Sequence, residues 1–311
     1  MGTLKPGLLK VAFVKLWGYV GVFVLASMLL ALVVYAPLEG VLKLEALRDL
    51  DLGKVFFENL TFTMTVLLCA GVAVRLLDRR PWGSLGFALY PKALWELGLG
   101  IAVGAGLLLG LWLVDGLFSV ATGADAVVLP EVKVAWADVP AVLVLMLFVA
   151  FNEELLIRGF PLQMLVRTVG APLAVALTSL GFGLLHLTGD AWNATTVVLD
   201  TGFSGILFAM AYLKTKSLWM PMGIHFSNNF IIFLFENPAL EDINLIPPEQ
   251  SQTVFFGWWL VNFPLYLMAF YLMYRWPYRP NETMKNYFDR YVRFGVAPQV
   301  SQTPLTTDEG E

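Results

Sequence analysis

The chain contains only two histidines, His186 and His225, and each lies in a long apolar run. A third apolar run carries the carboxylates Glu153 and Glu154, with Arg158 one helical turn beyond the second of them. Because ionisable side chains are costly inside a bilayer, those that occur there usually serve pairing or chemistry. Carboxylates and imidazoles are the groups that general acid–base catalysis requires. These residues therefore predict a hydrolytic site buried among apolar helices.

The charged residues of the apolar run that contains Glu153 and Glu154 fall on two faces of the expected helix. Glu154 and Arg158 are four residues apart, so they share a face and can pair. Glu153 points about 100° away from Glu154 and is free to accept a proton from water. A purely structural ion pair would explain Glu154 and Arg158 equally well.

The two histidines each share a helix face with a second notable side chain. Phe182 precedes His186 by four residues, and Asn229 follows His225 by four. An imidazole can hold a water molecule and transfer its proton, and an imidazole with a carboxamide can donate hydrogen bonds to a developing oxyanion. Each histidine alone could also be a hydrogen-bonding contact between helices. The occurrence of both histidines with the carboxylate pair favours one shared catalytic site.

The elements that must position these groups are membrane-spanning helices. The chain is 58% hydrophobic and 14% charged, with a mean hydropathy of +0.71, whereas soluble domains carry roughly 25% charged residues. Apolar runs long enough to cross a bilayer, about 20 residues, recur along it. We expect an all-α polytopic membrane protein with about eight transmembrane helices. The predicted spans are 12–35, 56–77, 94–118, 139–157, 172–188, 195–213, 218–235 and 253–275.

The basic residues between these spans predict the orientation, because cytoplasmic loops carry an excess of Lys and Arg. With the N-terminus in the cytoplasm, most basic residues fall in inner segments: Lys5, Lys10, Arg79, Arg80, Lys92, Arg167, Lys214, Lys216, Arg275, Arg279, Lys285, Arg290 and Arg293. The outer segments then hold Lys43, Arg48, Lys54 and Lys133. The pattern favours both termini in the cytoplasm, and we expect a prokaryotic plasma membrane.

The chain divides into four predicted regions. Residues 1–138 comprise the N-terminal transmembrane helices, with an amphipathic interfacial helix at 38–54. Residues 139–235 form the core that carries the polar motifs, and 236–280 hold a last transmembrane helix. Residues 281–311 form a surface segment and a disordered tail. No basic cluster with interleaved aromatic residues indicates nucleic-acid binding, and the expected environment is the lipid bilayer.

The predicted span ends leave a difference in depth between two key residues. With a rise of 1.5 Å per residue and a core of ~30 Å, Glu153 and His186 would differ in depth by roughly 10 Å. Helix tilt, a fourth span that continues past Pro161, or a fifth span that begins inside the membrane would each remove the difference. The sequence does not choose among these, and we expect residues 159–170 to form a second interfacial segment.

Three motifs in this region resemble those of a known family. They are EExxxR at 153–158, FxxxH at 182–186 and HxxxN at 225–229, in that order and on separate predicted spans. Together they resemble the CPBP family of intramembrane proteases (CAAX proteases and bacteriocin-processing enzymes, also called Abi). That family includes the type II CAAX prenyl endopeptidases. The resemblance covers roughly residues 139–235.

The resemblance implies roles for the motif residues. Glu153 is implied to be the general base, and His186 its partner on the attacking water. His225 and Asn229 are implied to stabilise the oxyanion. The supporting residues of the first motif are Glu154 and Arg158. The implied substrate is a peptide or protein, with a prenylated C-terminus or a bacteriocin-type peptide as options.

The metal requirement stays open at the level of sequence. A carboxylate and two imidazoles, here Glu153, His186 and His225, could hold Zn²⁺ with an open position. The HExxH signature of zinc peptidases is absent, and the better-understood members of the family are viewed as glutamate-dependent. We therefore expect no cofactor, with zinc as the alternative.

The same region of the sequence also allows other functional interpretations. Gly202, Ser204 and Gly205 fit the GxSG pattern of rhomboid serine proteases, although the glycines expected around His225 are missing. Asp200 precedes Thr and Gly as in aspartic proteases, but lacks a second intramembrane Asp. Buried charges could also line a proton-coupled transporter, or belong to a non-catalytic immunity protein. Inverted repeats, which are typical of transporters, are not found.

Overall fold

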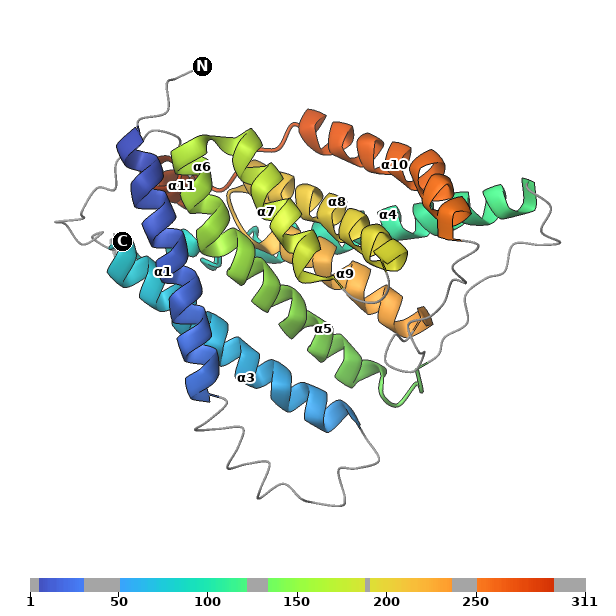
Figure 1. Ribbon diagram of the computed structural model, residues 1–311, viewed down its shortest axis with the longest axis horizontal. Helices are drawn as coiled ribbons and strands as arrows, with labels where there is room; N and C mark the ends of the chain where they lie inside the picture. Colours follow the sequence, from blue (N-terminus) through green and yellow to red (C-terminus); the bar gives the residue numbers. More distant parts are fainter. Residues whose placement is uncertain (1–5, 31–50, 122–133, 188–190, 237–250, 294–311) are drawn as a thin grey trace.

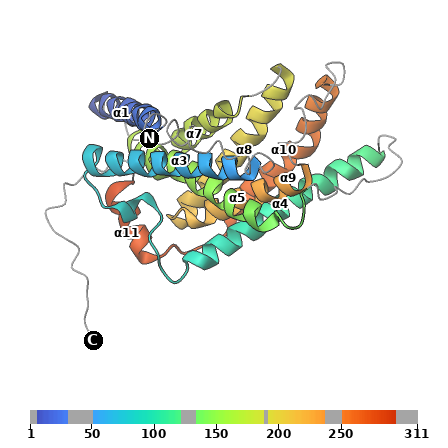
Figure 2. The same ribbon diagram turned by 90° about the horizontal axis from the view of Figure 1, so that it is seen from below.

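In the computed structural model, the described residues are 6–30, 51–121, 134–187, 191–236 and 251–293, and they contain helices and no strands. The helices pack as one bundle of roughly antiparallel elements (Figures 1 and 2). The α-helices are α1 (Pro6–Leu30), α3 (Asp51–Val72), α4 (Ala93–Ala121), α5 (Val139–Glu154), α6 (Gln163–Val169), α7 (Ala171–Leu185), α8 (Ala191–Thr215), α9 (Trp219–Glu236), α10 (Ser251–Arg275) and α11 (Glu282–Tyr291). Two π-helical segments, η3 (Ala73–Leu77) and η5 (Leu155–Leu162), and the 3₁₀ helix η4 (Trp82–Leu85) complete the set.

The prediction of an all-helical membrane protein is confirmed. Within the part of the chain that the structure describes, four helices are long and apolar enough to cross a bilayer: Leu9–Leu30, Phe56–Leu77, Ala93–Val114 and Val139–Val169. Helix is present in all eight predicted segments, but the number of spans stays a prediction. The predicted interfacial helix at 38–54 lies outside the described residues as far as residue 50, as does the predicted tail from residue 294.

The fourth span is longer than predicted. Helices α5, η5 and α6 run on without a break, so the span covers Val139–Val169 and is 31 residues long. The predicted helix end at 157 is therefore wrong, whereas the interfacial position predicted for 159–170 stays a prediction. Pro161 does not end the helix, because it lies in the wider π-helical turn of η5, where the usual hydrogen-bond ladder is already altered. The chain reverses at Gly170, whose φ of +85° favours glycine.

This continuation removes the predicted difference in depth. Glu153 and His186 now lie on either side of one helical hairpin that turns at Gly170. Measured along its helix from this turn, each residue lies roughly 22–24 Å away, because the rise is about 1.5 Å per residue. Of the three explanations left open by the sequence, the continued fourth span is the one that the structure has.

Glycines let α4 and α9 pack with their backbones in contact. A Cβ atom added to Gly223 of α9 would lie 2.2 Å from the carbonyl oxygen of Leu97 and 3.0 Å from the Cα of Gly100. A Cβ atom added to Gly104 of α4 would lie 2.5 Å from the carbonyl oxygen of Ile224. Small residues at such crossings are typical of helix packing in membranes. The packing fixes the position of α9, which carries His225.

Replacing Gly223 by Ala is expected to lower the stability of the protein in detergent by about 1–3 kcal/mol, the usual cost of overpacking. The added methyl group would meet backbone atoms, which cannot turn aside as a side chain can. The melting temperature of the purified variant measures the effect. Gly98→Ala on α4 is the matched control, because nothing lies within 4 Å of its added Cβ atom. Equal melting temperatures for the two variants would contradict the packing argument.

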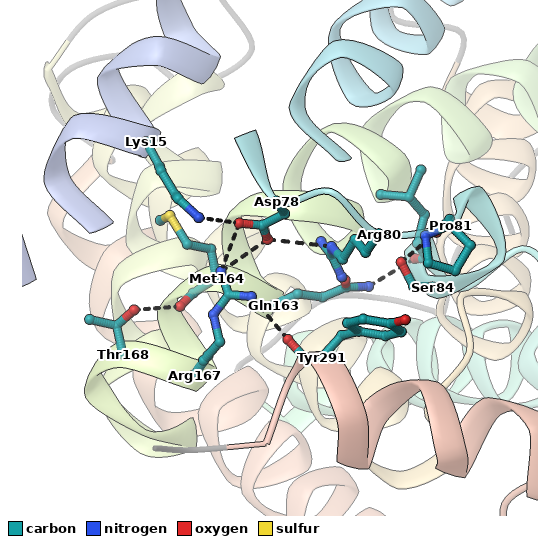
Figure 3. Close-up of polar contacts among 11 residues, drawn as sticks. Lys15, Asp78, Arg80, Pro81, Ser84, Gln163, Met164, Arg167, Thr168 and Tyr291 are labelled. Atoms are coloured by element: carbon teal, nitrogen blue, oxygen red, sulfur yellow. Dashed lines mark hydrogen bonds and ion pairs between the residues drawn. The ribbon is translucent and has the colours of Figure 1, made fainter. Parts of the chain in front are cut away.

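A buried ionic cluster joins the N-terminal helices to the core (Figure 3). The carboxylate of Asp78, just after η3, accepts hydrogen bonds from Lys15 of α1 and from Arg167 of α6, whose Nη2 lies 2.9 Å from Oδ2. Arg80 approaches the same oxygen to 3.4 Å and also donates to Gln163. The cluster therefore ties three separate parts of the chain to one carboxylate.

The cationic neighbours determine the ionisation of Asp78. Burial by itself would raise the pKa of this carboxyl, but Arg167, Arg80 and Lys15 together outweigh it and hold the pKa below its usual value. A depressed pKa stabilises the fold above the unfolded pKa of Asp, about 3.9. This contribution is lost as the pH falls through the lower pKa of the folded state. At neutral pH the cluster is fully formed.

Replacing Asp78 by Asn is expected to destabilise the protein by about 3–5 kcal/mol, because it leaves buried cations without their counter-charge. Thermal unfolding of the purified variant in detergent tests this. Glu282→Gln is the control, since Glu282 is 81% exposed and its nitrogen–oxygen distance to Lys285 is 3.9 Å. That variant is expected to melt at the wild-type temperature. If the control lowered the melting temperature as much as Asp78→Asn does, the ionic cluster would not contribute more to stability than an exposed ion pair.

Candidate active site

The three motifs meet near the middle of the bundle. Glu153 and Glu154 are the last residues of α5, directly before the π-helical segment η5 that contains Arg158. His186 follows the last residue of α7, and His225 lies in the second turn of α9. A π-helical turn changes the directions in which side chains leave a helix, and such turns are frequent at functional sites.

Glu154 joins Arg158 and His225 in a buried polar set. Oε1 of Glu154 accepts a hydrogen bond from Nη1 of Arg158 at 2.9 Å, as the spacing of four residues predicts. The same oxygen lies 2.8 Å from Nδ1 of His225. Glu154 and Arg158 have no exposed surface, and Arg158 also donates to the carbonyl oxygen of Gly205 at 3.2 Å. The carboxylate therefore holds one imidazole and is balanced by one guanidinium.

The hydrogen bonds of the two imidazoles fix their tautomers. Nδ1 of His186 lies 2.8 Å from the carbonyl oxygen of Phe182, so this nitrogen must carry a proton. Nδ1 of His225 faces the carboxylate of Glu154 and must donate in the same way. In the neutral rings, both Nε2 atoms then present lone pairs. The backbone and the buried carboxylate thus set which nitrogen of each ring is available for chemistry.

Both Nε2 atoms are directed at Glu153. Its Oε2 lies 3.5 Å from Nε2 of His225 and 3.8 Å from Nε2 of His186. This oxygen is buried and has no hydrogen-bond partner among the described residues. Three acceptors thus converge on one small volume, which is favourable only if a proton or a donor such as water lies among them. The arrangement suits a group that binds and deprotonates water.

Aromatic rings hold the imidazoles in place. Phe208 stacks on His225 with ring centroids 4.7 Å apart and an interplanar angle of 15°. Phe182 meets His186 edge to face, with centroids also 4.7 Å apart. The guanidinium of Arg158 lies over the rings of Phe182 and Phe208, with its Cζ 4.5 and 5.2 Å from their centroids. These contacts restrict rotation of both histidines.

A cavity of about 330 Å³ adjoins the histidines. His186, His225 and Asn229 contribute to its wall, whereas Glu153 is not among the lining residues. Glu153 therefore lies directly beside the cavity, with Oε2 3.5 Å from Nε2 of His225 and 3.8 Å from Nε2 of His186. The other lining residues are Leu107, Leu108, Leu111, Trp112, Phe182, Asp200, Thr201, Ser204, Phe208, Asn228, Ile232, Asn262 and Tyr266.

The structure brings the sequence-predicted residues together to different degrees. Glu153 lies beside both imidazoles, while Asn229 shares only the cavity wall with them. Ser204 and Asp200, which belong to the rival protease patterns, also line the cavity. The hydroxyl of Ser204 lies 3.1 Å from that of Tyr266, and no hydrogen bond joins it to either histidine in the described part of the chain.

Sequence reasoning missed two contributors to the site. Phe208 stacks on an imidazole, but a phenylalanine in an apolar run carries no signal of its own. Asn262 lines the cavity from α10 and is the more detectable omission, since it is a carboxamide within the predicted span 253–275. A polar residue in such a run marks a site that faces the bundle interior.

The buried polar site within apolar helices defines an integral membrane protein with a polar cavity beside an acid–base cluster. Comparison with known families then gives a match. Residues 135–231 match the family model described as Type II CAAX prenyl endopeptidase Rce1-like. The matched segment contains all three motifs, and the resemblance predicted from them is confirmed over these residues. It is a protease family. Comparison with curated proteins gives no match.

Proposed function

We propose that this protein is an intramembrane endopeptidase that uses a glutamate and two histidines to hydrolyse a peptide bond. The observation that carries the proposal is the convergence of both imidazole Nε2 atoms on the buried Oε2 of Glu153. The adjoining cavity and the match to a protease family support it. The proposed setting is a bundle of eight spans with both termini in the cytoplasm of a prokaryotic cell.

In the proposed reaction, Glu153 and His186 hold a water molecule at the edge of the cavity. Glu153 takes one proton as the water oxygen bonds to the carbonyl carbon of the substrate. His225, when protonated at Nε2, and the carboxamide of Asn229 donate hydrogen bonds to the resulting oxyanion. The proton held by Glu153 then passes to the leaving nitrogen as the carbon–nitrogen bond breaks. The products are a carboxylic acid and an amine.

Glu154 and Arg158 act on this chemistry through His225. The carboxylate of Glu154 holds the Nδ1 proton of the ring, and this keeps Nε2 directed at the reacting atoms. It also stabilises the imidazolium that forms when the ring is protonated. Arg158 balances Glu154, so that the buried set does not carry an additional negative charge beside Glu153.

A zinc-dependent reaction is the alternative mechanism. Glu153, His186 and His225 supply suitable donor atoms, and a bound Zn²⁺ would activate water and polarise the carbonyl group. The absence of the HExxH signature and the resemblance to glutamate-dependent members of the family lead us to favour the metal-free mechanism. Retention of full activity after dialysis against a chelator, with no zinc in the purified protein, would support that choice.

A proton-coupled transporter is the alternative function, since buried ionisable groups beside a polar cavity also suit proton transfer. A quenched peptide library, incubated with the purified protein in detergent, separates the two functions. Cleavage that disappears in Glu153→Ala and persists in Ser204→Ala supports the glutamate-type protease. Proton-driven uptake into liposomes without any cleavage would support the transporter. Peptides that accumulate uncleaved in cells carrying the Glu153 variant would identify the substrate, including whether it is prenylated.

A further inference from the structure

We propose that an apolar groove between α4 and α10 binds an anionic phospholipid of the surrounding bilayer, with one acyl chain in the groove and the phosphate at Arg275. The groove has a volume of about 630 Å³ and is distinct from the cavity beside the histidines. Binding of this kind requires neither the proposed catalysis nor a particular orientation in the membrane. Three features carry it: an apolar lining, a cationic group at one end, and aromatic residues around that end.

The lining of the groove suits a hydrocarbon chain. Met220 of α9, which is 1% exposed, lies at its base. Its wall on α4 runs from Leu99 to Leu107, roughly 12 Å at about 1.5 Å per residue. Met268 and Leu272 contribute the wall on α10 and are 53% and 57% exposed. The groove therefore opens at the apolar outer surface of the bundle, where lipid can enter it.

One end of the groove carries a positive charge. Arg275, the last residue of α10, is exposed and is the one charged residue among the described residues that line the groove. Lys214 donates a hydrogen bond to the carbonyl oxygen of the adjacent Tyr274 at 2.8 Å, which places a second cation nearby. In the part of the chain that the structure describes, neither cation forms an ion pair with a carboxylate. Basic residues at the end of a pocket between membrane helices suit an anionic headgroup.

Aromatic side chains surround this cationic end. Tyr274 and Trp276 flank Arg275, and Trp95 lies in the first turn of α4. Tyr274 and Trp95 are 73% and 65% exposed. Exposed Trp and Tyr at the ends of apolar helices are typical of the membrane–water interface on either side of a bilayer. A lipid whose phosphate contacts Arg275 would thus have its headgroup at the interface and its chain along the groove.

The groove adjoins the structure that supports the two histidines. Leu107 lines both the groove and the cavity. Met220 belongs to the same hydrophobic cluster as Phe182 and Phe208, whose rings contact the imidazoles. An acyl chain in the groove would extend this cluster. Because a ligand that binds only the folded state stabilises it, the bound lipid should also raise the melting temperature.

Photo-cross-linking of the full-length protein tests the proposal. The protein is reconstituted in phosphatidylcholine nanodiscs that contain a small fraction of phosphatidylglycerol with a diazirine in one acyl chain. After irradiation, mass spectrometry identifies the cross-linked residues, and the yield is measured with increasing unlabelled phosphatidylglycerol or phosphatidylcholine. We expect cross-links at residues that line the groove. Phosphatidylglycerol should displace the probe at a concentration at least about 5-fold lower than phosphatidylcholine, the usual effect of one basic residue on an anionic headgroup.

A bulky side chain at Gly106 should block the groove. Gly106 lines the groove, and nothing lies within 4 Å of an added Cβ atom, so Gly106→Trp can enter this space without a clash at its Cβ atom. We expect the yield of groove cross-links to fall about 10-fold or more, since losing the burial of two methylene groups already has an effect of this size. Gly98→Trp is the matched control, because Gly98 also has nothing within 4 Å but does not line the groove. Both variants should melt in detergent at the wild-type temperature.

The headgroup is tested separately at Arg275. Arg275→Gln should reduce the preference for phosphatidylglycerol over phosphatidylcholine about 5-fold while cross-links in the groove persist. Arg75→Gln, at an exposed arginine of η3 that does not line the groove, should keep the full preference.

Three results would overturn the proposal. Cross-links outside the groove, or a yield that Gly106→Trp leaves unchanged, would mean that the chain does not lie there. Equal displacement by the two phospholipids in the wild-type protein would remove the role of the anionic headgroup. Displacement by a peptide that carries an isoprenoid chain, without displacement by phosphatidylglycerol, would assign the groove to a substrate instead of a bilayer lipid.

Discussion

Replacing Glu153 by Gln is expected to lower kcat/KM for peptide cleavage by about 10²–10⁴-fold, the usual contribution of a general acid–base group. Gln keeps the size and polarity of the side chain but cannot accept a proton from water. Since Oε2 of Glu153 has no hydrogen-bond partner among the described residues, the change removes no hydrogen bond of this atom. The melting temperature should therefore stay close to that of the wild type. Cleavage of a quenched peptide by the purified variant measures the effect.

Two neighbouring variants make this result specific. Asp200→Asn removes a second carboxylate from the cavity wall, and Ser204→Ala removes the hydroxyl of the GxSG pattern. Both are expected to reduce cleavage by less than about 10-fold, as for residues that only contact a substrate. Loss of activity in Ser204→Ala with retention in Glu153→Gln would replace the glutamate mechanism by a serine mechanism. Equal losses in Glu153→Gln and Asp200→Asn would indicate a pair of carboxylates instead.

The sequence predicts the parts of this site that depend on helical spacing. Glu154 and Arg158 pair because residues four apart share a helix face, and the same spacing puts Phe182 against His186. Apolar run length, likewise, indicates which segments are helices. Such features need only local geometry. They could therefore be predicted without any knowledge of how the helices pack.

The remaining features depend on contacts between distant segments. The bond between Glu154 and His225 joins residues 71 positions apart, and it assigns Glu154 to an imidazole as well as to Arg158. The continuation of the fourth span depends on a π-helical turn that accommodates Pro161, although proline usually predicts a helix end. Asn262 reaches the cavity only because α10 packs against α8. Helical periodicity carries no information about these pairings.

The buried pair of Glu154 and Arg158 gives a second large expected effect, this time on stability. Arg158→Met should destabilise the protein by about 3–5 kcal/mol, because it leaves the fully buried carboxylate of Glu154 without its cation. Adding Glu154→Gln removes that unbalanced charge. The double variant should therefore regain most of the lost stability, measured as melting temperature in detergent. Arg75→Met, at an exposed arginine of η3, is the control and should melt like the wild type.

Activity should not return with stability in the double variant. The amide of Gln can donate to Nδ1 of His225 as well as accept from it, so the tautomer and orientation of the ring are no longer fixed. The imidazolium also loses the carboxylate that stabilises it. We expect cleavage to stay about 10²–10⁴-fold below that of the wild type. A double variant that regains both stability and cleavage would assign the pair a purely structural role, because the only requirement would then be a neutral, well-packed site. Stability without cleavage would instead mean that Glu154 positions His225 for the reaction.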